Sequence, residues 1–100
     1  MNQFCLEEIA EIRTNFRSAD FWLTRKNSAS LVGEPKLTTS NVKEDIGIKI
    51  TSSKFETNFI YYYLLHQYQL GFFRMISRGT IRLKHLTIDS VKHINLLQSI

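Results

Sequence analysis

A cluster of basic, hydroxyl and glycine residues in the second half of the chain has the composition of an anion-binding segment. Its members are Arg74, Arg78, Gly79, Thr80, Arg82, Lys84 and His85. Glycine lets the main chain approach a ligand closely, a threonine hydroxyl can donate a hydrogen bond, and arginine binds phosphate or the edge of guanine through paired hydrogen bonds. A helix starting near Thr80 would also point free amides at an anion. We therefore expect residues 76–86 to form a DNA-facing loop and helix start.

The distribution of charge along the chain supports this expectation. Residues 57–88 contain no Asp or Glu. Residues 51–100 hold six Lys or Arg and two acids, whereas residues 1–50 hold seven of each, so the net charge of +4 comes from the second half. A basic face suits nucleic acid or an anionic membrane surface. An ordinary glycine turn with solvated arginines has the same composition, so the pattern alone leaves both interpretations open.

Catalytic and metal-binding patterns are weak by comparison. Cys5 is the single cysteine, which excludes an internal disulfide and an all-cysteine zinc site. The histidines form no His-x-x-x-His pair with a nearby acid, and the acids are scattered rather than clustered around a place for Mg²⁺. We expect no cofactor, no metal site and no catalytic residue. A small nuclease is the least favoured of the function classes considered.

Length and composition predict one folded domain over residues 1–100. The sequence is 43% hydrophobic and 22% charged, which is typical of folded proteins. Its N-terminus lacks the basic start and apolar core of a signal peptide. The longest apolar stretch, residues 59–65, is too short to cross a bilayer. We therefore expect a cytoplasmic protein that has no membrane partner.

Several segments must position the basic cluster. Apolar residues at helical spacing predict a short helix over residues 4–13, and alternating or β-branched residues predict strands over residues 21–25 and 46–50. An aromatic helix is predicted from Phe59 to Leu70, capped by Thr57 and Asn58 and ended by Gly71. Because it is apolar on most sides, we expect it at the centre of the core.

The remaining segments complete the predicted fold. Residues 84–91 have a second helical pattern, and residues 93–97 resemble a final strand. These elements predict an α/β fold of mixed α+β type, in which a short mixed or antiparallel sheet packs with the aromatic helix and shorter helices. The four tyrosines of the aromatic helix, Tyr61, Tyr62, Tyr63 and Tyr68, are either core residues or a stacking surface for unpaired bases.

Four segments, taken in order, resemble a target-recognition domain of the specificity subunits of type I restriction–modification enzymes. They are Leu6-Glu-Glu-Ile-Ala-Glu-Ile-Arg13, Phe21-Trp-Leu-Thr-Arg-Lys26 with Val32-Gly33, Phe59-Ile-Tyr-Tyr-Tyr-Leu-Leu65, and Gly79-Thr-Ile-Arg-Leu-Lys-His-Leu86 followed by residues 91–97. The first looks like the opening L-x-x-I-A-x-I helix of such domains. Each pattern is short and degenerate, so the resemblance depends on their order along most of the chain.

The resemblance implies a non-catalytic domain that reads half of a bipartite double-stranded DNA site, while partner subunits methylate or cut the DNA. Carried onto this chain, the DNA contacts would be Arg25, Lys26, Asn27, Arg74, Arg78, Gly79, Thr80, Arg82, Lys84 and His85. The arginines and Asn27 would read bases, and Gly79, Thr80 and Lys84 would position phosphates.

The chain departs from the family pattern in three places. Asn15 stands where a glycine usually follows the opening helix, and the stretch between Arg17 and Phe21 is short. The chain ends without the Leu-Pro-Pro motif and the spacer helix that, in the family, joins recognition domains and docks methylating subunits. It would then be one recognition half, a minimal or degenerate version of such a domain, or a regulator derived from one. The alternative function is a protein-interaction half-domain that pairs with methyltransferase or restriction subunits or with a second half-domain, which the apolar residues 94–100 favour.

Overall fold

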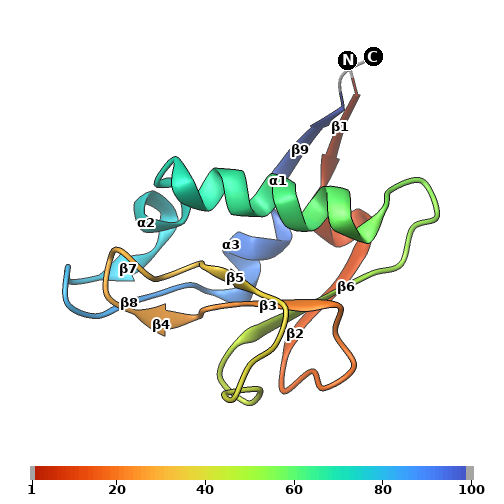
Figure 1. The fold of residues 1–100 in the computed structure, drawn as a ribbon. Coiled ribbons are helices and arrows are strands. Elements are labelled where there is room, and N and C mark those ends of the chain that lie inside the picture. Colours follow the sequence, from red (N-terminus) through yellow and green to blue (C-terminus); the bar gives the residue numbers. More distant parts are fainter. Residues whose placement is uncertain (1, 99–100) are drawn as a thin grey trace.

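The computed structural model describes residues 2–98, which form three antiparallel sheets and three α-helices (Figure 1). The strands are β1 (Asn2–Cys5), β2 (Ala10–Thr14), β3 (Phe21–Leu23), β4 (Lys26–Asn27), β5 (Pro35–Lys36), β6 (Ile46–Ile50), β7 (Arg78–Gly79), β8 (Lys84–His85) and β9 (Asn95–Gln98). The helices are the 3₁₀ turn η1 (Leu6–Glu8), α1 (Thr57–Gln69), α2 (Phe72–Ile76) and α3 (Ile88–Lys92). The predicted mixture of helices and strands is confirmed, and all strand pairs within the described residues are antiparallel.

The largest sheet has the strand order β2-β6-β3-β5, and the predicted strand over residues 46–50 lies inside it. Ile46 and Ile48 are fully buried on one face of β6. Gly47 lies on the opposite face, where an added Cβ would stand 2.5 Å from the Cβ of Phe16. The loop after β2 therefore covers this face, and the indole N–H of Trp22 fixes it by donating to the Phe16 carbonyl at 3.0 Å. Glycine at position 47 is what allows this close packing.

The predicted helix over residues 4–13 is wrong. This segment forms the end of β1, the turn η1 and the strand β2. Ala10 and Ile12 are buried while Glu11 and Arg13 are exposed, which is the period of a strand. β2 pairs with β6 along its whole length. Pairing and burial therefore override a local spacing that also fits a helix.

The predicted aromatic helix is confirmed as α1, with different details at its ends. The helix begins at Thr57, so Thr57 and Asn58 are helical residues rather than caps, and the N-cap position is Glu56 without a side-chain hydrogen bond. Gly71 has a φ of 85°, which L side chains rarely adopt, and it separates α1 from α2. The expected role of Gly71 in ending the helix is therefore confirmed.

The expected position of α1 at the centre of the core is wrong. Ile60 and Leu64 are fully buried on one face, but Phe59 and Tyr62 on the outer face are 53% and 63% exposed. The helix crosses one side of the molecule rather than its middle (Figure 1). The high aromatic content did not reveal which face of the helix is exposed, because a tyrosine can pack its ring and still present its hydroxyl at the surface.

The predicted helix over residues 84–91 is wrong in its first half. This segment begins as strand β8, and only α3 is helical. Thr87 caps α3, because its hydroxyl oxygen accepts a hydrogen bond from the Ser90 N–H at 3.1 Å. The final strand is confirmed as β9, which pairs with β1 and so brings the two ends of the described chain together (Figure 1).

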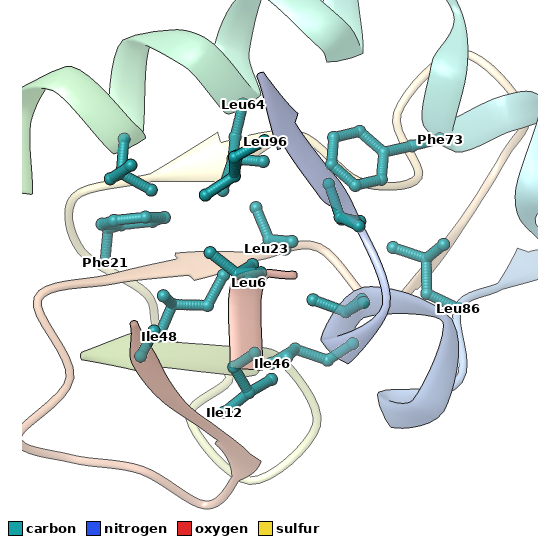
Figure 2. Close-up of a cluster of buried hydrophobic side chains, with 14 of the residues drawn as sticks. Leu6, Ile12, Phe21, Leu23, Ile46, Ile48, Leu64, Phe73, Leu86 and Leu96 are labelled. Carbon is teal, nitrogen blue, oxygen red and sulfur yellow. The ribbon is translucent and has the colours of Figure 1, made fainter. Parts of the chain in front are cut away.

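The described residues share one hydrophobic core. Leu6, Phe21, Leu23, Leu64, Phe73, Leu86 and Leu96 meet in it, although they come from segments spread along the chain (Figure 2). Ile94 and Leu96 are 3% and 2% exposed, so this part of the apolar C-terminal segment is covered by its own chain. Ser99 and Ile100 lie outside the described residues. The Cα radius of gyration of 12.7 Å is that of a compact domain of this length. No described helix combines the length and apolar character needed to cross a membrane.

Candidate nucleic-acid interface

Two groups of predicted contact residues, far apart in the sequence, meet in one small sheet (Figure 1). We call it the β4–β8–β7 sheet, with β8 in the middle. Lys26 of β4 is the register partner of His85, which is also the partner of Arg78 in β7. The second row of partners consists of Asn27, Lys84 and Gly79.

The register places three basic side chains in a row. Directly opposed residues of an antiparallel pair point to the same face, so Lys26, His85 and Arg78 share one face of the sheet. Neighbouring strands lie about 4.8 Å apart, and the row therefore spans about 10 Å. Lys26 and Arg78 are exposed, and His85 is half-buried. A row of this length can follow the backbone of a polyanion, which a single cation cannot.

A groove lies beside this row. It has a volume of about 390 Å³ and is lined by Arg25, Lys26, Leu83 and His85. The Nε atom of Arg25 is buried and has no hydrogen-bond partner among the described residues. The groove therefore has a basic wall on the β4 side and an apolar contribution from Leu83, which can contact the sugar of a nucleotide.

The carboxylate of Glu44 offsets part of this charge. Oε2 of Glu44 lies 3.4 Å from Nη1 of Arg25 and 3.7 Å from Nζ of Lys26. Glu44 comes from the loop before β6, and nothing in the local sequence indicated that it would face β4. Two of the predicted contact residues are consequently paired within the protein. By contrast, the described residues provide no ion pair for the four other predicted cations, which are Arg74, Arg78, Arg82 and Lys84.

The predicted helix start at Thr80 is wrong, because residues 78–85 form a β-hairpin. The Thr80 N–H donates to the Leu83 carbonyl at 3.1 Å, and the Thr80 hydroxyl accepts from the Leu83 N–H at 3.3 Å. Gly79 has a φ of 110°, and any side chain there would collide with the Leu83 carbonyl oxygen. Gly79 and Thr80 therefore build the turn that presents Arg82. This segment contains no helix start whose free amides could bind a phosphate.

Arg74 lies outside the β4–β8–β7 sheet. It belongs to α2 and is exposed, and it lines a separate hollow of about 230 Å³ together with Ser30, Tyr68 and Gln69. Nη2 of Arg74 would be 3.0 Å from a Cβ added at Gly71, so its guanidinium folds back over the end of α1. The structure thus joins nine of the ten predicted contacts, from residues 25–27 and 78–85, and leaves Arg74 apart.

The loop after β4 links the hairpin to α1. The Ala29 N–H donates to the Ile81 carbonyl at 2.8 Å, and the Tyr68 hydroxyl donates to the Ser30 carbonyl at 2.6 Å. Burial raises the pKa of the Tyr68 phenol, and the negative charge of Glu34 raises this pKa further. Tyr68 therefore stays protonated at neutral pH and keeps its hydrogen bond, which positions the loop beneath the turn of the hairpin.

The remaining tyrosines of α1 fit a structural role better than a stacking surface. Tyr61 donates to the Pro35 carbonyl at 3.5 Å, and Tyr63 donates to the Asn95 carbonyl at 3.3 Å. Tyr62 is exposed, but the face of α1 that carries it is not part of the β4–β8–β7 sheet.

Groups that could hold a metal ion do not gather within the described residues. No cluster of three or more His, Cys, Asp or Glu side chains is arranged to hold a metal ion there. The buried carboxylate of Asp45 already accepts hydrogen bonds from Lys36 at 2.7 Å and from Thr39 at 2.5 Å. The thiol of Cys5 is 3.7 Å from the side-chain oxygen of Asn95. Each of these two side chains therefore has a polar partner within the protein.

Sequence reasoning missed two exposed apolar residues in the hairpin. Ile81 and Leu83 flank Arg82 and are 77% and 62% exposed. Their signal is the apolar–basic–apolar alternation of Ile81-Arg82-Leu83, which has the period of a strand rather than of a helix.

Comparisons of this chain with models of known protein families, with curated proteins and with solved structures found no match.

Proposed function

We propose that this chain is a non-catalytic DNA-binding module whose contact surface is the β4–β8–β7 sheet. The observation that carries the proposal is the meeting of residues 26–27 with residues 78–85 in one sheet. Lys26, Arg78 and His85 form a basic row there, and Arg82 stands at the turn. A surface that combines exposed arginine and lysine with few acids suits a phosphate backbone.

The charge around this sheet favours a polyanion over a small anion. The segment from residue 57 to residue 88, which contributes β7 and β8, has no acidic residue. Lys26, His85 and Arg78 lie side by side on the three strands of the sheet rather than pointing at one centre, and the groove beside this row is open. A small anion is usually held by several donors that converge on it, whereas a nucleic-acid backbone needs donors at repeated positions.

Within this function, we propose the role of a target-recognition domain similar to those of type I specificity subunits. The order of the family-like segments and the position of two of them in the β4–β8–β7 sheet support the proposal. Its weakest part is the opening segment, which resembled a helix of the family and forms η1 and β2 instead. In this role, methyltransferase and restriction subunits would supply catalysis.

The test of DNA binding is a fluorescence-anisotropy titration of a labelled mixed-sequence duplex at several salt concentrations. Contacts from four or five cations predict a slope of log affinity against log salt of about −4. Arg78→Ala should weaken binding and reduce the size of the slope by about 1, because the exposed Arg78 belongs to the basic row. Lys54→Ala is the matched control, because Lys54 is exposed in the loop before α1, at the opposite end of that helix from the hairpin. Absence of binding at low salt, or binding without a salt slope, contradicts the proposal.

A second candidate function is a protein-interaction half-domain, and the outer face of α1 favours it. Phe59 and Tyr62 are one helical turn apart and more than half exposed. The apolar C-terminal segment gives this function less support, because its residues Ile94 and Leu96 are buried within the chain itself. Sedimentation velocity with methyltransferase or restriction subunits tests this alternative. Loss of a complex in Phe59→Ser would support it, and a monomer that ignores every such subunit would contradict it.

A further inference from the structure

The turn of the β7–β8 hairpin presents a pair of aliphatic side chains to solvent. Ile81 is 77% exposed and Leu83 is 62% exposed, and neither belongs to the hydrophobic core. Single exposed aliphatic residues are common on proteins and need no explanation. Here the two lie within three residues of each other, in a turn that could accept polar residues at both positions.

The backbone of this turn is held in place while its side chains remain free. Thr80 and Leu83 close the turn through two hydrogen bonds, of 3.1 and 3.3 Å. The Ile81 carbonyl accepts a third from Ala29 at 2.8 Å. The exposure of Ile81 is therefore a property of an ordered turn. A side chain presented in this way loses little further conformational freedom when it enters a partner.

The charges around the turn identify the chemistry of the partner. Arg82 lies between the two aliphatic residues, and Arg78 and Lys84 lie in the strands below them. An apolar tip inside a ring of cations is complementary to an apolar slot inside a ring of anions. The minor groove of duplex DNA has this form, because phosphates line its edges and stacked bases lie inside.

We propose that Ile81 inserts as a wedge between two stacked base pairs from the minor groove and bends the duplex. Leu83 lines the groove beside Lys26 and His85, so it would contact a sugar next to the insertion point while Arg78, Arg82 and Lys84 bind the flanking phosphates. This inference rests on the proposed DNA-binding function and adds its mode of contact. Apolar wedges of this kind kink DNA by about 20–90°.

The mode of contact predicts a sequence preference that involves no hydrogen bond to a base. Pyrimidine–purine steps such as TA unstack easily, whereas A-tracts are stiff. A duplex with a central TA step should therefore bind more tightly than one with a central A-tract of the same length and charge. A preference of about three- to tenfold is expected from the difference in deformation energy.

The experiment measures affinity and bending together with duplexes that carry a fluorescent donor and acceptor at their two ends. Ile81→Ser is the test variant, because serine keeps the turn and removes the wedge. Leu37→Ser is the matched control, because Leu37 is also exposed, at 63%, and follows β5 outside the β4–β8–β7 sheet. Circular dichroism and thermal melting establish that both variants remain folded.

We expect the native chain and Leu37→Ser to raise energy transfer on the TA duplex. Ile81→Ser should keep salt-dependent binding, lose the rise in energy transfer and lose the preference for the TA step. If the native chain binds without bending, or Ile81→Ser bends the duplex equally well, the wedge is refuted and the DNA-binding function stands. If no duplex binds even at low salt, both are refuted. Vesicles of anionic and zwitterionic lipid form the last arm, and binding to anionic vesicles without DNA binding would assign the tip to a membrane surface instead.

Discussion

Removing the negative charge of Glu44 should increase the affinity for DNA. The Glu44 carboxylate oxygen lies 3.4 Å from the guanidinium of Arg25 and 3.7 Å from the ammonium of Lys26. A phosphate that contacts the same two cations must stand beside this carboxylate or displace it. Glu44→Gln keeps the size and shape of the side chain, and it removes the repulsion. An increase in affinity is informative because damage to the fold would give a decrease.

The size of the effect follows from Coulomb's law. A phosphate on Arg25 and Lys26 would lie about 6 Å from the Glu44 carboxylate, where two unit charges repel by about 0.7 kcal/mol in bulk water and about 1.4 kcal/mol at half that dielectric constant. These energies correspond to about 3-fold and 10-fold in affinity. The three side chains are between 30% and 50% exposed, so the lower value is the better expectation. The gain should shrink as salt screens the charges.

The assay compares Glu44→Gln with Glu7→Gln in duplex titrations at low and moderate salt. Glu7 is exposed in η1, so this control changes the net charge by the same amount at a distant place. Glu44→Gln should gain about threefold over the native chain at low salt, and Glu7→Gln should gain less. Equal gains would show that only net charge matters. An unchanged or weaker affinity for a folded Glu44→Gln would refute the assignment of Arg25 and Lys26 to the DNA contact.

Three further substitutions test the supports of the β4–β8–β7 sheet. Gly79→Ala forces a side chain against the Leu83 carbonyl at a φ of 110°, so it should cost about 1–3 kcal/mol of local strain and weaken duplex binding, as measured by melting and anisotropy. Tyr68→Phe removes the hydrogen bond to Ser30 and should lower the free energy of unfolding by about 1 kcal/mol at neutral pH. Burial raises the pKa of Tyr68 in the folded state. The stability that this phenol contributes is therefore complete below about pH 10 and is lost as the pH rises through the raised pKa. The free energy of unfolding of Tyr68→Phe in urea should consequently depend less on pH in that range than that of the native chain. Asp45→Asn removes the charge of a buried carboxylate that pairs with the half-buried Lys36 and accepts from Thr39, so it should lower the free energy of unfolding in urea by about 2–4 kcal/mol.

The strands and the long helix could be predicted where the sequence carries one strong local signal. The alternation of Ile46, Ile48 and Ile50 fixes a strand, and the aromatic density before Gly71 fixes a helix and its end. The first segment was mistaken because Leu6, Ile9 and Arg13 fit a helical period while Ala10 and Ile12 fit a strand. Pairing with β6, some 35 residues later, decides between the two periods, and no short window contains that information.

The composition of the candidate site was predictable, and its geometry was only partly so. Basic residues near Asn27 and Lys84 stand out in the sequence, but their pairing depends on how β3 leads into β4 and how α2 leads into β7. The hairpin was mistaken for a helix start because Gly-Thr precedes both kinds of element. Glu44 could not have been assigned to the site from the sequence, because it reaches Arg25 only through the loop before β6.

The most direct test of the central claim is to map the DNA contact residue by residue. Backbone amide signals of the ¹⁵N-labelled chain would be followed by NMR during titration with a mixed-sequence duplex at low salt. We predict that the largest shifts fall on residues 25–29 and 78–85, with small shifts on the outer face of α1 and in the loop around Lys54. Shifts centred on Phe59 and Tyr62, or no shifts at any duplex concentration, would contradict the assignment of the β4–β8–β7 sheet as a DNA-binding surface.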